Sequence, residues 1–216
     1  MEFRLSNIKR LVEEYGRGDP FRFATDDKWL VNRYREHNVI SGMHKCRYYR
    51  LFHKLSELYK PRFIVELGSY WATAAAHFAA GCPTADVVTI DVHKEVHPND
   101  DVAWRKAQEA AGYYNNLHFI HGWTWDAHVI FEVCARPYPI DILYIDAGHK
   151  YDQVVREWDL YSWLLADEAL VIADDVFDAA GATIDMMKFW DELDYEKFLD
   201  PHIHSGIPMG FLRFTR

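Results

Sequence analysis

The chain has 216 residues, half of them hydrophobic, which is enough to bury a sizeable core and is not the composition of a disordered polypeptide. Its formal net charge of −9 argues against a nucleic-acid-binding surface, because attraction to phosphates requires clustered lysine and arginine. No apolar stretch reaches the roughly 18 residues that cross a membrane, and the N-terminus lacks the apolar segment of a signal peptide.

The three cysteines, Cys46, Cys82 and Cys134, are far apart in the sequence and lack the spacing of a metal site. An odd number of separated cysteines is typical of buried thiols in a reducing compartment. We therefore expect a cytoplasmic protein that acts on a small molecule, with neither nucleic acid nor a membrane as a partner.

Residues 1–60 are polar, aromatic and helical in character, and we expect them to form a helical cap on a main domain that spans residues 61–216. Aromatic side chains and a histidine of this cap are candidates to cover the site and select the substrate: Trp29, Tyr34, His44, Tyr48 and Tyr49. The same aromatic content is consistent with a homodimer contact.

The cap ends in the helical stretch Arg47–Tyr59, which places Leu51, Leu55 and Leu58 on one face. Pro61 ends this helix, because a proline pushes the preceding residue out of the α region. Basic residues are also concentrated here, and we interpret them as a solvated helix face or a site for an acidic partner: Arg33, Arg35, Lys45, Arg47, Arg50 and Lys54.

From residue 61 onward, strand-like and helix-like segments alternate, which is typical of βαβ units in a parallel sheet with both faces covered. The predicted strands are Phe63–Leu67, Val87–Asp91, Leu117–Ile120, Ile140–Ile145, Ala169–Ala173, Tyr195–Leu199 and Met209–Thr215. The predicted helices are Ala72–Ala80, Val102–Tyr113, Trp125–Ala135, Tyr151–Leu165 and Ala180–Leu193. The last two strands lack a helix between them and should pair antiparallel.

These elements predict an α/β fold, a Rossmann-like sheet of seven strands that is mostly parallel and ends in an antiparallel pair. Ligands of such sheets bind outside the carboxyl ends of the strands, so the residues that end each strand are the candidates for the site.

The first strand ends in Glu66 and Gly68, and Ser69 follows in the turn to the next helix. The glycine allows a sharp turn and a close approach of the backbone to a ligand, and the acid can pair with a cationic or hydroxyl group but would repel a pyrophosphate. Asp91 ends the second strand, where an acid can accept both hydroxyls of a ribose. The alternatives are that the first segment is an ordinary strand–turn–helix with a chance glutamate, and that Asp91 is a helix-capping or solvated loop acid.

The third strand leads into an aromatic turn, His121-Gly122-Trp123-Thr124-Trp125-Asp126. We expect Gly122 and Trp123 to lie against an adenine ring. Alternatively, Trp125 packs against the start of a helix that Thr124 or Asp126 caps.

Three acids end the fourth and fifth strands: Asp146, Asp174 and Asp175. If the two strands are neighbours, their backbones lie about 4.8 Å apart and the carboxylates repel one another unless a cation lies between them. Oxygen-rich sites of this kind suit Mg²⁺, Mn²⁺ or Ca²⁺. The alternative is that Asp174 or Asp175 points away and caps the following helix.

A histidine follows Asp146 by three residues, and at this position His149 can take a proton from a substrate hydroxyl. His121 is a weaker rival for the role of base. His202 and His204 lie in a late loop and are candidates for contact with the substrate.

Together these motifs resemble the class I S-adenosylmethionine-dependent O-methyltransferases over roughly residues 60–193. The matching segments are Glu66-Leu67-Gly68, Asp91, Tyr144-Ile145-Asp146-Ala147-Gly148-His149-Lys150-Tyr151 and Ala173-Asp174-Asp175-Val176. The likeness is to small-molecule enzymes related to the catechol, caffeoyl-CoA and cephalosporin/macrocin groups. It implies that Glu66, Gly68 and Asp91 hold the methyl donor, that the three aspartates hold a divalent cation such as Mg²⁺, and that His149 stands where the catechol-type enzymes carry a lysine base.

The sequence departs from this family at three positions. Ala72 stands where a glycine is usual, Gly148 replaces a common aspartate, and Asp175 follows Asp174 where the catechol-type enzymes have asparagine. These departures concern the metal site and the base, and leave the class of enzyme intact.

We therefore predict a methyltransferase that moves a methyl group from S-adenosylmethionine to a hydroxyl of a small metabolite, with help from a divalent metal. Two alternatives are a nicotinamide-dependent oxidoreductase, which the absent G-x-G-x-x-G disfavours, and a non-catalytic module that only binds the cofactor. The sequence does not name the acceptor: sugars, catechols, antibiotics and amines all remain.

Overall fold

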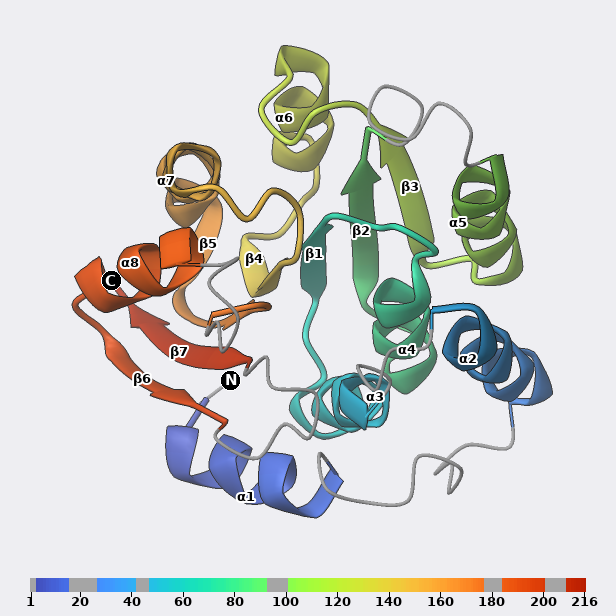
Figure 1. Cartoon of the computed structure of the whole chain (residues 1–216), viewed down its shortest axis with the longest axis horizontal. Coiled ribbons are helices and arrows are strands. Elements are labelled where there is room, and N and C mark those ends of the chain that lie inside the picture. Colours follow the sequence, from blue (N-terminus) through green and yellow to red (C-terminus); the bar gives the residue numbers. More distant parts are fainter. Residues whose placement is uncertain (1–2, 16–26, 42–46, 93–100, 177–183, 201–208) are drawn as a thin grey trace.

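The computed structural model describes residues 3–15, 27–41, 47–92, 101–176, 184–200 and 209–216 (Figure 1). Its centre is a sheet of seven strands in the order β3-β2-β1-β4-β5-β7-β6. The strands are β1 (Phe63–Leu67), β2 (Asp86–Asp91), β3 (Leu117–His121), β4 (Ile140–Ile145), β5 (Leu165–Ala173), β6 (Glu196–Leu199) and β7 (Gly210–Thr215). The first five run parallel, and β7 is antiparallel to both β5 and β6. The predicted fold class is confirmed.

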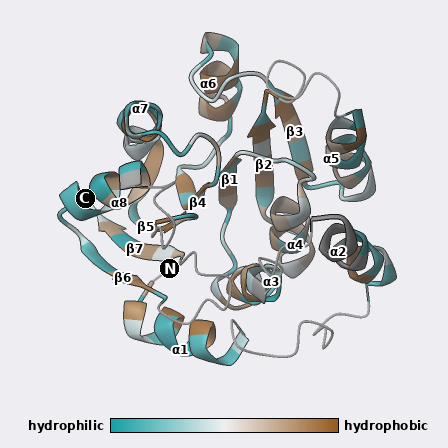
Figure 2. Cartoon of the chain, in the orientation of Figure 1, coloured by the Kyte–Doolittle hydropathy of each residue, from teal (hydrophilic) through white to brown (hydrophobic). Residues whose placement is uncertain are grey.

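Helices cover both faces of the sheet (Figure 1). They are α1 (Leu5–Tyr15), α2 (Lys28–Ser41), α3 (Arg47–Tyr59), α4 (Thr73–Gly81), α5 (Asp101–Tyr113), α6 (Ala127–Cys134), α7 (Tyr151–Tyr161) and α8 (Ile184–Glu192). Helices α1 to α5 pack on one face, where Ile64 of β1 points, and α6 to α8 pack on the other, with Val65. Because both faces are covered, the strands are almost continuously apolar, as the hydrophobic colour of β2 shows in Figure 2.

The N-terminal helices share the core of the sheet domain. Phe3 and Ile8 at the start of the chain pack in one cluster with Leu51 and Leu55 of α3 and Phe78 of α4. The N–H of Phe3 also donates a 3.1 Å hydrogen bond to the carboxylate of Glu168 in β5. The division into a helical cap of residues 1–60 and a main domain of residues 61–216 stays a prediction.

Two expectations for the cap are wrong in part. Leu51 and Leu55 are buried, but Leu58 is 52% exposed. Arg33 is buried rather than solvated: its guanidinium donates to the carbonyl oxygens of Trp71 (2.9 Å) and Lys106 and pairs with the carboxylate of Glu109. Arg33 therefore ties α2 to the turn before α4 and to α5.

The boundary between α7 and β5 also differs from the expectation of a helix over Tyr151–Leu165. Helix α7 ends at Tyr161, a short 3₁₀ turn spans Ser162–Leu164, and β5 begins at Leu165 rather than Ala169. The first residues of β5 alternate between buried and more exposed, and the pairing with β4 is interrupted by a bulge. Such a half-covered strand start resembles an amphipathic helix in sequence.

Two further details concern the other predicted helices. Helix α6 begins at Ala127, so Trp125 belongs to the turn before it. Residues 180–183 of the last predicted helix lie outside the described residues.

No helix in the ranges given above is long and apolar enough to cross a membrane.

Candidate active site

A cavity of about 440 Å³ lies at the carboxyl ends of β1, β2, β3 and β4. Five predicted site residues line it: Gly68, Asp91, Gly122, Trp123 and Asp146. Its volume falls within the range of small-molecule and cofactor pockets, about 300–1,000 Å³. The side chains that end four neighbouring strands therefore meet around one space.

Gly68 lets β1 turn directly against the end of β4. Its φ is +92°, and a Cβ added there would lie 2.1 Å from the carbonyl oxygen of Asp146. Both facts require glycine at this position, and they explain why the turn backbone forms part of the cavity wall.

Two further residues of this turn are held in left-handed conformations that non-glycine residues rarely adopt. Tyr70 has φ +44° and Ala72 φ +52°, and the N–H of Ala72 donates a 2.5 Å hydrogen bond to the carbonyl of Ser69. The N–H of Tyr70 donates a 2.8 Å hydrogen bond to the carboxylate of Asp91. Asp91 thus fixes the turn as well as lining the cavity.

Glu66 and Ser69 are not among the residues that line this cavity in the described part of the chain. Glu66 is buried on the α4 face of the sheet, where it accepts hydrogen bonds from the hydroxyl of Thr89 and the backbone of Ala75. Ser69 lies 2.5 Å from the same threonine hydroxyl. Burial raises the pKa of Glu66 well above its ordinary value.

The turn after β3 forms the opposite wall. Trp123 and Trp125 stack with their rings 5.1 Å apart and an interplanar angle of 13°. The carboxylate of Asp126 accepts a 2.9 Å hydrogen bond from the N–H of Trp123, so it closes this turn rather than capping α6. Thr124 donates a 2.6 Å hydrogen bond from its hydroxyl to Glu157 of α7.

The acids of β4 and β5 gather around His149. Its Nδ1 lies 3.1 Å from Asp175 Oδ2, and its Nε2 lies 3.6 Å from Asp146 Oδ1. Burial alone would lower the pKa of His149, but the interaction with Asp146 and the charges of Asp175 and Asp174 outweigh it and raise the pKa. The hydroxyl of Tyr144 also donates a 2.9 Å hydrogen bond to Asp146.

The same arrangement bears on the predicted metal ligands. Asp174 and Asp175 are buried, and Asp175 has φ +56°. Within the ranges the structure describes, no three His, Cys, Asp or Glu side chains converge closely enough to hold a metal ion. Instead, the imidazole of His149 lies between the carboxylates of Asp146 and Asp175.

The other predicted residues are distributed as follows. His121 contacts the backbone carbonyl of Val92 and the ring of Trp104. Tyr48 is buried and donates a 3.3 Å hydrogen bond to Asp200. Trp29 stacks on Tyr113, Tyr49 stacks on His77, and His202, His204, His44 and the side chain of Tyr34 lie outside the described residues.

Two lining residues from α7, Gln153 and Glu157, were not predicted from the sequence. A Cβ added at Gly148 would lie 2.3 Å from the side-chain oxygen of Gln153, so the side chain of Gln153 would have to shift to admit another residue there. Glu157 lies on the buried side of α7 with Val154 and Tyr161. The sequence could have indicated Glu157, because this acid stands on the otherwise apolar face of an amphipathic helix.

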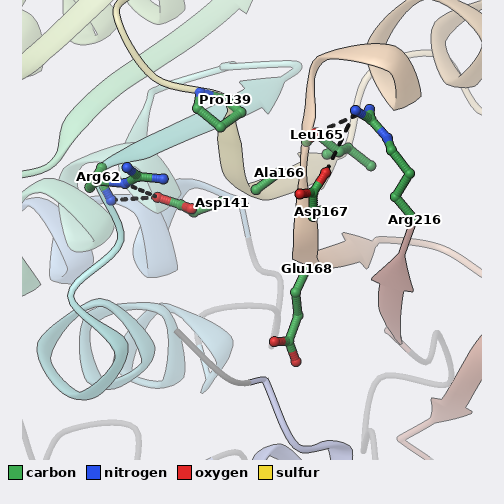
Figure 3. Close-up of a pocket in the computed structure, with 8 residues that line it drawn as sticks. All are labelled: Arg62, Pro139, Asp141, Leu165, Ala166, Asp167, Glu168 and Arg216. Carbon is green, nitrogen blue, oxygen red and sulfur yellow. Dashed lines mark hydrogen bonds and ion pairs between the residues drawn. The ribbon is translucent and has the colours of Figure 1, made fainter.

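A second hollow of about 370 Å³ lies at the opposite edge of the sheet, where β4 and β5 begin (Figure 3). Four of its charged side chains form two ion pairs, Arg62 with Asp141 and Arg216 with Asp167 (Figure 3), and the fifth, Glu168, pairs with Arg213. This hollow lies at the amino ends of the strands, whereas ligands of such sheets bind at the carboxyl ends. We therefore do not treat it as part of the candidate site.

The sheet order defines a Rossmann-like α/β fold, and its cavity lies at the carboxyl ends of the strands, where such folds bind their ligands. A family model described as "Methyltransferase domain" matches residues 65–176, and the chain belongs to this family. The predicted class of enzyme, a methyltransferase, is thereby confirmed. No curated protein sequence matches the chain significantly.

Solved methyltransferase structures share the fold. They include the O-methyltransferase TomG from Streptomyces achromogenes, involved in tomaymycin synthesis and in complex with SAM (TM-score 0.66, 16% identity, 100% of both chains covered). An O-methyltransferase from Bacillus cereus in complex with SAH is similar (TM-score 0.67, 14% identity, 98% and 97% covered). So is the SAH-bound methyltransferase PaMTH1 of Podospora anserina (TM-score 0.68, 15% identity, 100% and 98% covered).

Proposed function

We propose that this methyltransferase takes its methyl group from S-adenosylmethionine and transfers it to a hydroxyl of a small molecule. The observation that carries the proposal is the cavity at the carboxyl ends of the strands, which joins Asp91 of β2 to Asp146 of β4. Two solved relatives of the same fold are described as O-methyltransferases that bind SAM or SAH, which supports both the donor and the hydroxyl acceptor.

We infer that the donor is held by the turn after β1, the end of β2 and the turn after β3. Asp91 accepts the ribose hydroxyls, Gly68 allows the backbone to approach the ligand, and Gly122 and Trp123 flank the adenine. Glu66 and Ser69 support the site without lining the cavity, because both hydrogen-bond to Thr89 and so fix the turn after β1.

Methyl transfer from a sulfonium is an in-line displacement, so alignment of acceptor, methyl and sulfur supplies much of the catalysis. We infer that His149, when its imidazole is neutral, accepts the proton that the acceptor hydroxyl releases. Asp175 orients the ring through its 3.1 Å contact with Nδ1. Nε2 lies 3.6 Å from Asp146 and makes no hydrogen bond within the described residues, so it is the nitrogen that we assign to the proton.

Divalent-metal assistance by Asp146, Asp174 and Asp175 is a second form of this proposal. Carboxylate oxygens are the ligands that Mg²⁺ prefers, and a bound ion would acidify and position the acceptor oxygen. The arrangement described does not fit an ion as it stands, because His149 lies between two of the carboxylates. We therefore assign no step to the metal.

A screen of hydroxylated acceptors with methyl-labelled S-adenosylmethionine tests the proposal. Label transferred to oxygen supports it, and label found on nitrogen or carbon across the whole screen contradicts the hydroxyl acceptor. Exhaustive chelation of an active pair decides the metal: unchanged turnover removes it, and a loss restored by Mg²⁺ establishes it.

We also infer a cytoplasmic enzyme, since Cys82 and Cys134 are not in disulfides. We also propose a homodimer contact. Tyr48 is buried, and Trp29 and Tyr49 stack on residues of the same chain, so these three side chains do not by themselves form its surface. Light scattering coupled to size-exclusion chromatography measures the mass in solution: a dimer mass supports the contact, and a monomer mass removes it.

A further inference from the structure

Glu157 is a buried acid whose hydrogen bonding is incomplete. It is 1% exposed on the inner face of α7, and its Oε1 accepts the 2.6 Å hydrogen bond from the hydroxyl of Thr124. Its Oε2 is also buried and has no hydrogen-bond partner within the described part of the chain. Native proteins rarely leave a buried carboxylate oxygen unpaired, so such an atom calls for an explanation.

The position of Glu157 explains its unpaired oxygen. Glu157 lines the proposed donor cavity together with Trp123, Thr124 and Trp125, and its Oε1 contacts this turn at Thr124. The turn it touches is fixed twice, since the hydroxyl of Tyr161, four residues further along α7, donates a 2.7 Å hydrogen bond to the carbonyl of Thr124. Glu157 is therefore held rigidly against the aromatic wall where we place the adenine.

The chemistry of the adenine ring selects the contact. The ring nitrogens are hydrogen-bond acceptors, and the exocyclic N6 amino group is the donor on its edge. An ionised carboxylate only accepts hydrogen bonds, so the amino group is the part of the ring that an oxygen of Glu157 can bind. A 6-oxo purine presents an acceptor at the same place, which would face the carboxylate oxygen and be repelled.

We propose that Oε2 of Glu157 accepts a hydrogen bond from the N6 amino group of the methyl donor's adenine, and so selects adenine over 6-oxo purines. The proposal deepens the proposed function and rests on it. Burial raises the pKa of Glu157 to about 7, and the amino group of a bound donor would favour the ionised form.

Calorimetry with two ligands tests it: S-adenosylhomocysteine and S-inosylhomocysteine, which carries an oxygen in place of the amino group. We expect the wild-type protein to bind the adenine ligand at least about 100-fold more tightly, because a site built to pair with a polar group discriminates strongly. In Glu157→Gln the side-chain amide can turn its NH₂ toward the 6-oxo group, and the preference should fall below about 10-fold or invert. Glu132→Gln removes an exposed acid from α6 and should keep the wild-type ratio.

The outcomes separate the two proposals. Equal binding of both ligands by the wild-type protein overturns the role of Glu157 without need of any variant. An unchanged ratio in a folded Glu157→Gln protein overturns it as well. If the wild-type protein binds neither ligand, it is the proposed function that fails.

Discussion

The backbone N–H of Tyr70, in the turn after β1, donates a 2.8 Å hydrogen bond to the carboxylate of Asp91 at the end of β2. Two neighbouring strands are thereby joined at the point where the cavity begins. The acid that we assign to the ribose therefore also stabilises the strained turn beside it, so its loss should affect binding and folding together.

Asp91→Ala should weaken binding of S-adenosylhomocysteine by at least about 10-fold, and lower the free energy of unfolding by about 0.5–1.5 kcal/mol, because the turn loses the solvent-exposed hydrogen bond from the N–H of Tyr70. Asp167→Ala removes an acid that is 89% exposed and serves as the control. Calorimetry and urea unfolding measure the two effects. Undiminished binding by Asp91→Ala would remove the ribose role.

Gly68→Ala should destabilise the protein by more than about 2 kcal/mol, because the new Cβ would meet the carbonyl of Asp146 and the residue has a positive φ. Gly112→Ala in α5 is the matched control, since a Cβ there meets nothing within 4 Å. In a helix this change should stabilise by about 0.5–1 kcal/mol. Urea unfolding of both variants checks the contrast, and a Gly68→Ala protein of wild-type stability contradicts it.

Ala72→Gly should be tolerated better than glycine elsewhere in the same segment. Ala72 has φ +52°, and glycine relieves the left-handed strain, worth about 1–2 kcal/mol. Ala79→Gly, at an equally buried alanine inside α4, has no strain to relieve and should cost about 1 kcal/mol in propensity alone. Thermal unfolding ranks the two variants, and a larger loss for Ala72→Gly would show that the turn is not strained.

Glu157→Gln should make the protein more stable at neutral and higher pH. Burial raises the pKa of Glu157 from 4.5 to about 7, even though Thr124 and His149 lower it. The folded state therefore binds a proton more readily than the unfolded state, and wild-type stability falls as the pH rises from about 4.5 to 7. Glutamine lacks this dependence, so the variant should gain up to about 3 kcal/mol above pH 7 and nothing below pH 4.5.

Urea unfolding of wild type and Glu157→Gln between pH 4.5 and 8 measures this difference. A gap that grows with pH, together with a loss of purine discrimination, would mean that the acid is kept for binding at the expense of stability. A gap that is constant with pH contradicts the raised pKa.

His149→Ala should reduce turnover of an identified acceptor by about 10²–10⁴-fold, the usual contribution of a positioned base. The expected loss is in kcat, while binding of S-adenosylhomocysteine stays near the wild-type value. His118→Ala is the control, because that histidine is 42% exposed on β3 and pairs with Asp86. Wild-type turnover by His149→Ala would assign the base to another residue.

The sheet was predictable because its strands are short apolar runs with clear ends. The bounds of β1 and β4 match the expectation to the residue: Phe63–Leu67 follows a proline and Ile140–Ile145 precedes an acid. The start of β5 was not predictable, because its first residues pair across a bulge and are half exposed. A local pattern of that kind does not distinguish a strand from a helix end.

The site was predictable where residues end strands, and less so elsewhere. Asp91 and Asp146 follow the rule that ligands bind at carboxyl strand ends, and both line the cavity. Glu66 lies on the α4 face with Ile64, two residues before it, which the alternation of a strand implies. Glu157 enters the cavity from α7, and its place there depends on packing between α7 and the turn after β3.

Calorimetric titration of the wild-type protein with S-adenosylhomocysteine, and separately with NADH, tests the central claim most directly. We predict one molecule of S-adenosylhomocysteine bound per chain, and no measurable binding of NADH, whose pyrophosphate finds no G-x-G-x-x-G turn after β1. Binding of NADH without binding of S-adenosylhomocysteine would contradict the proposed methyl donor.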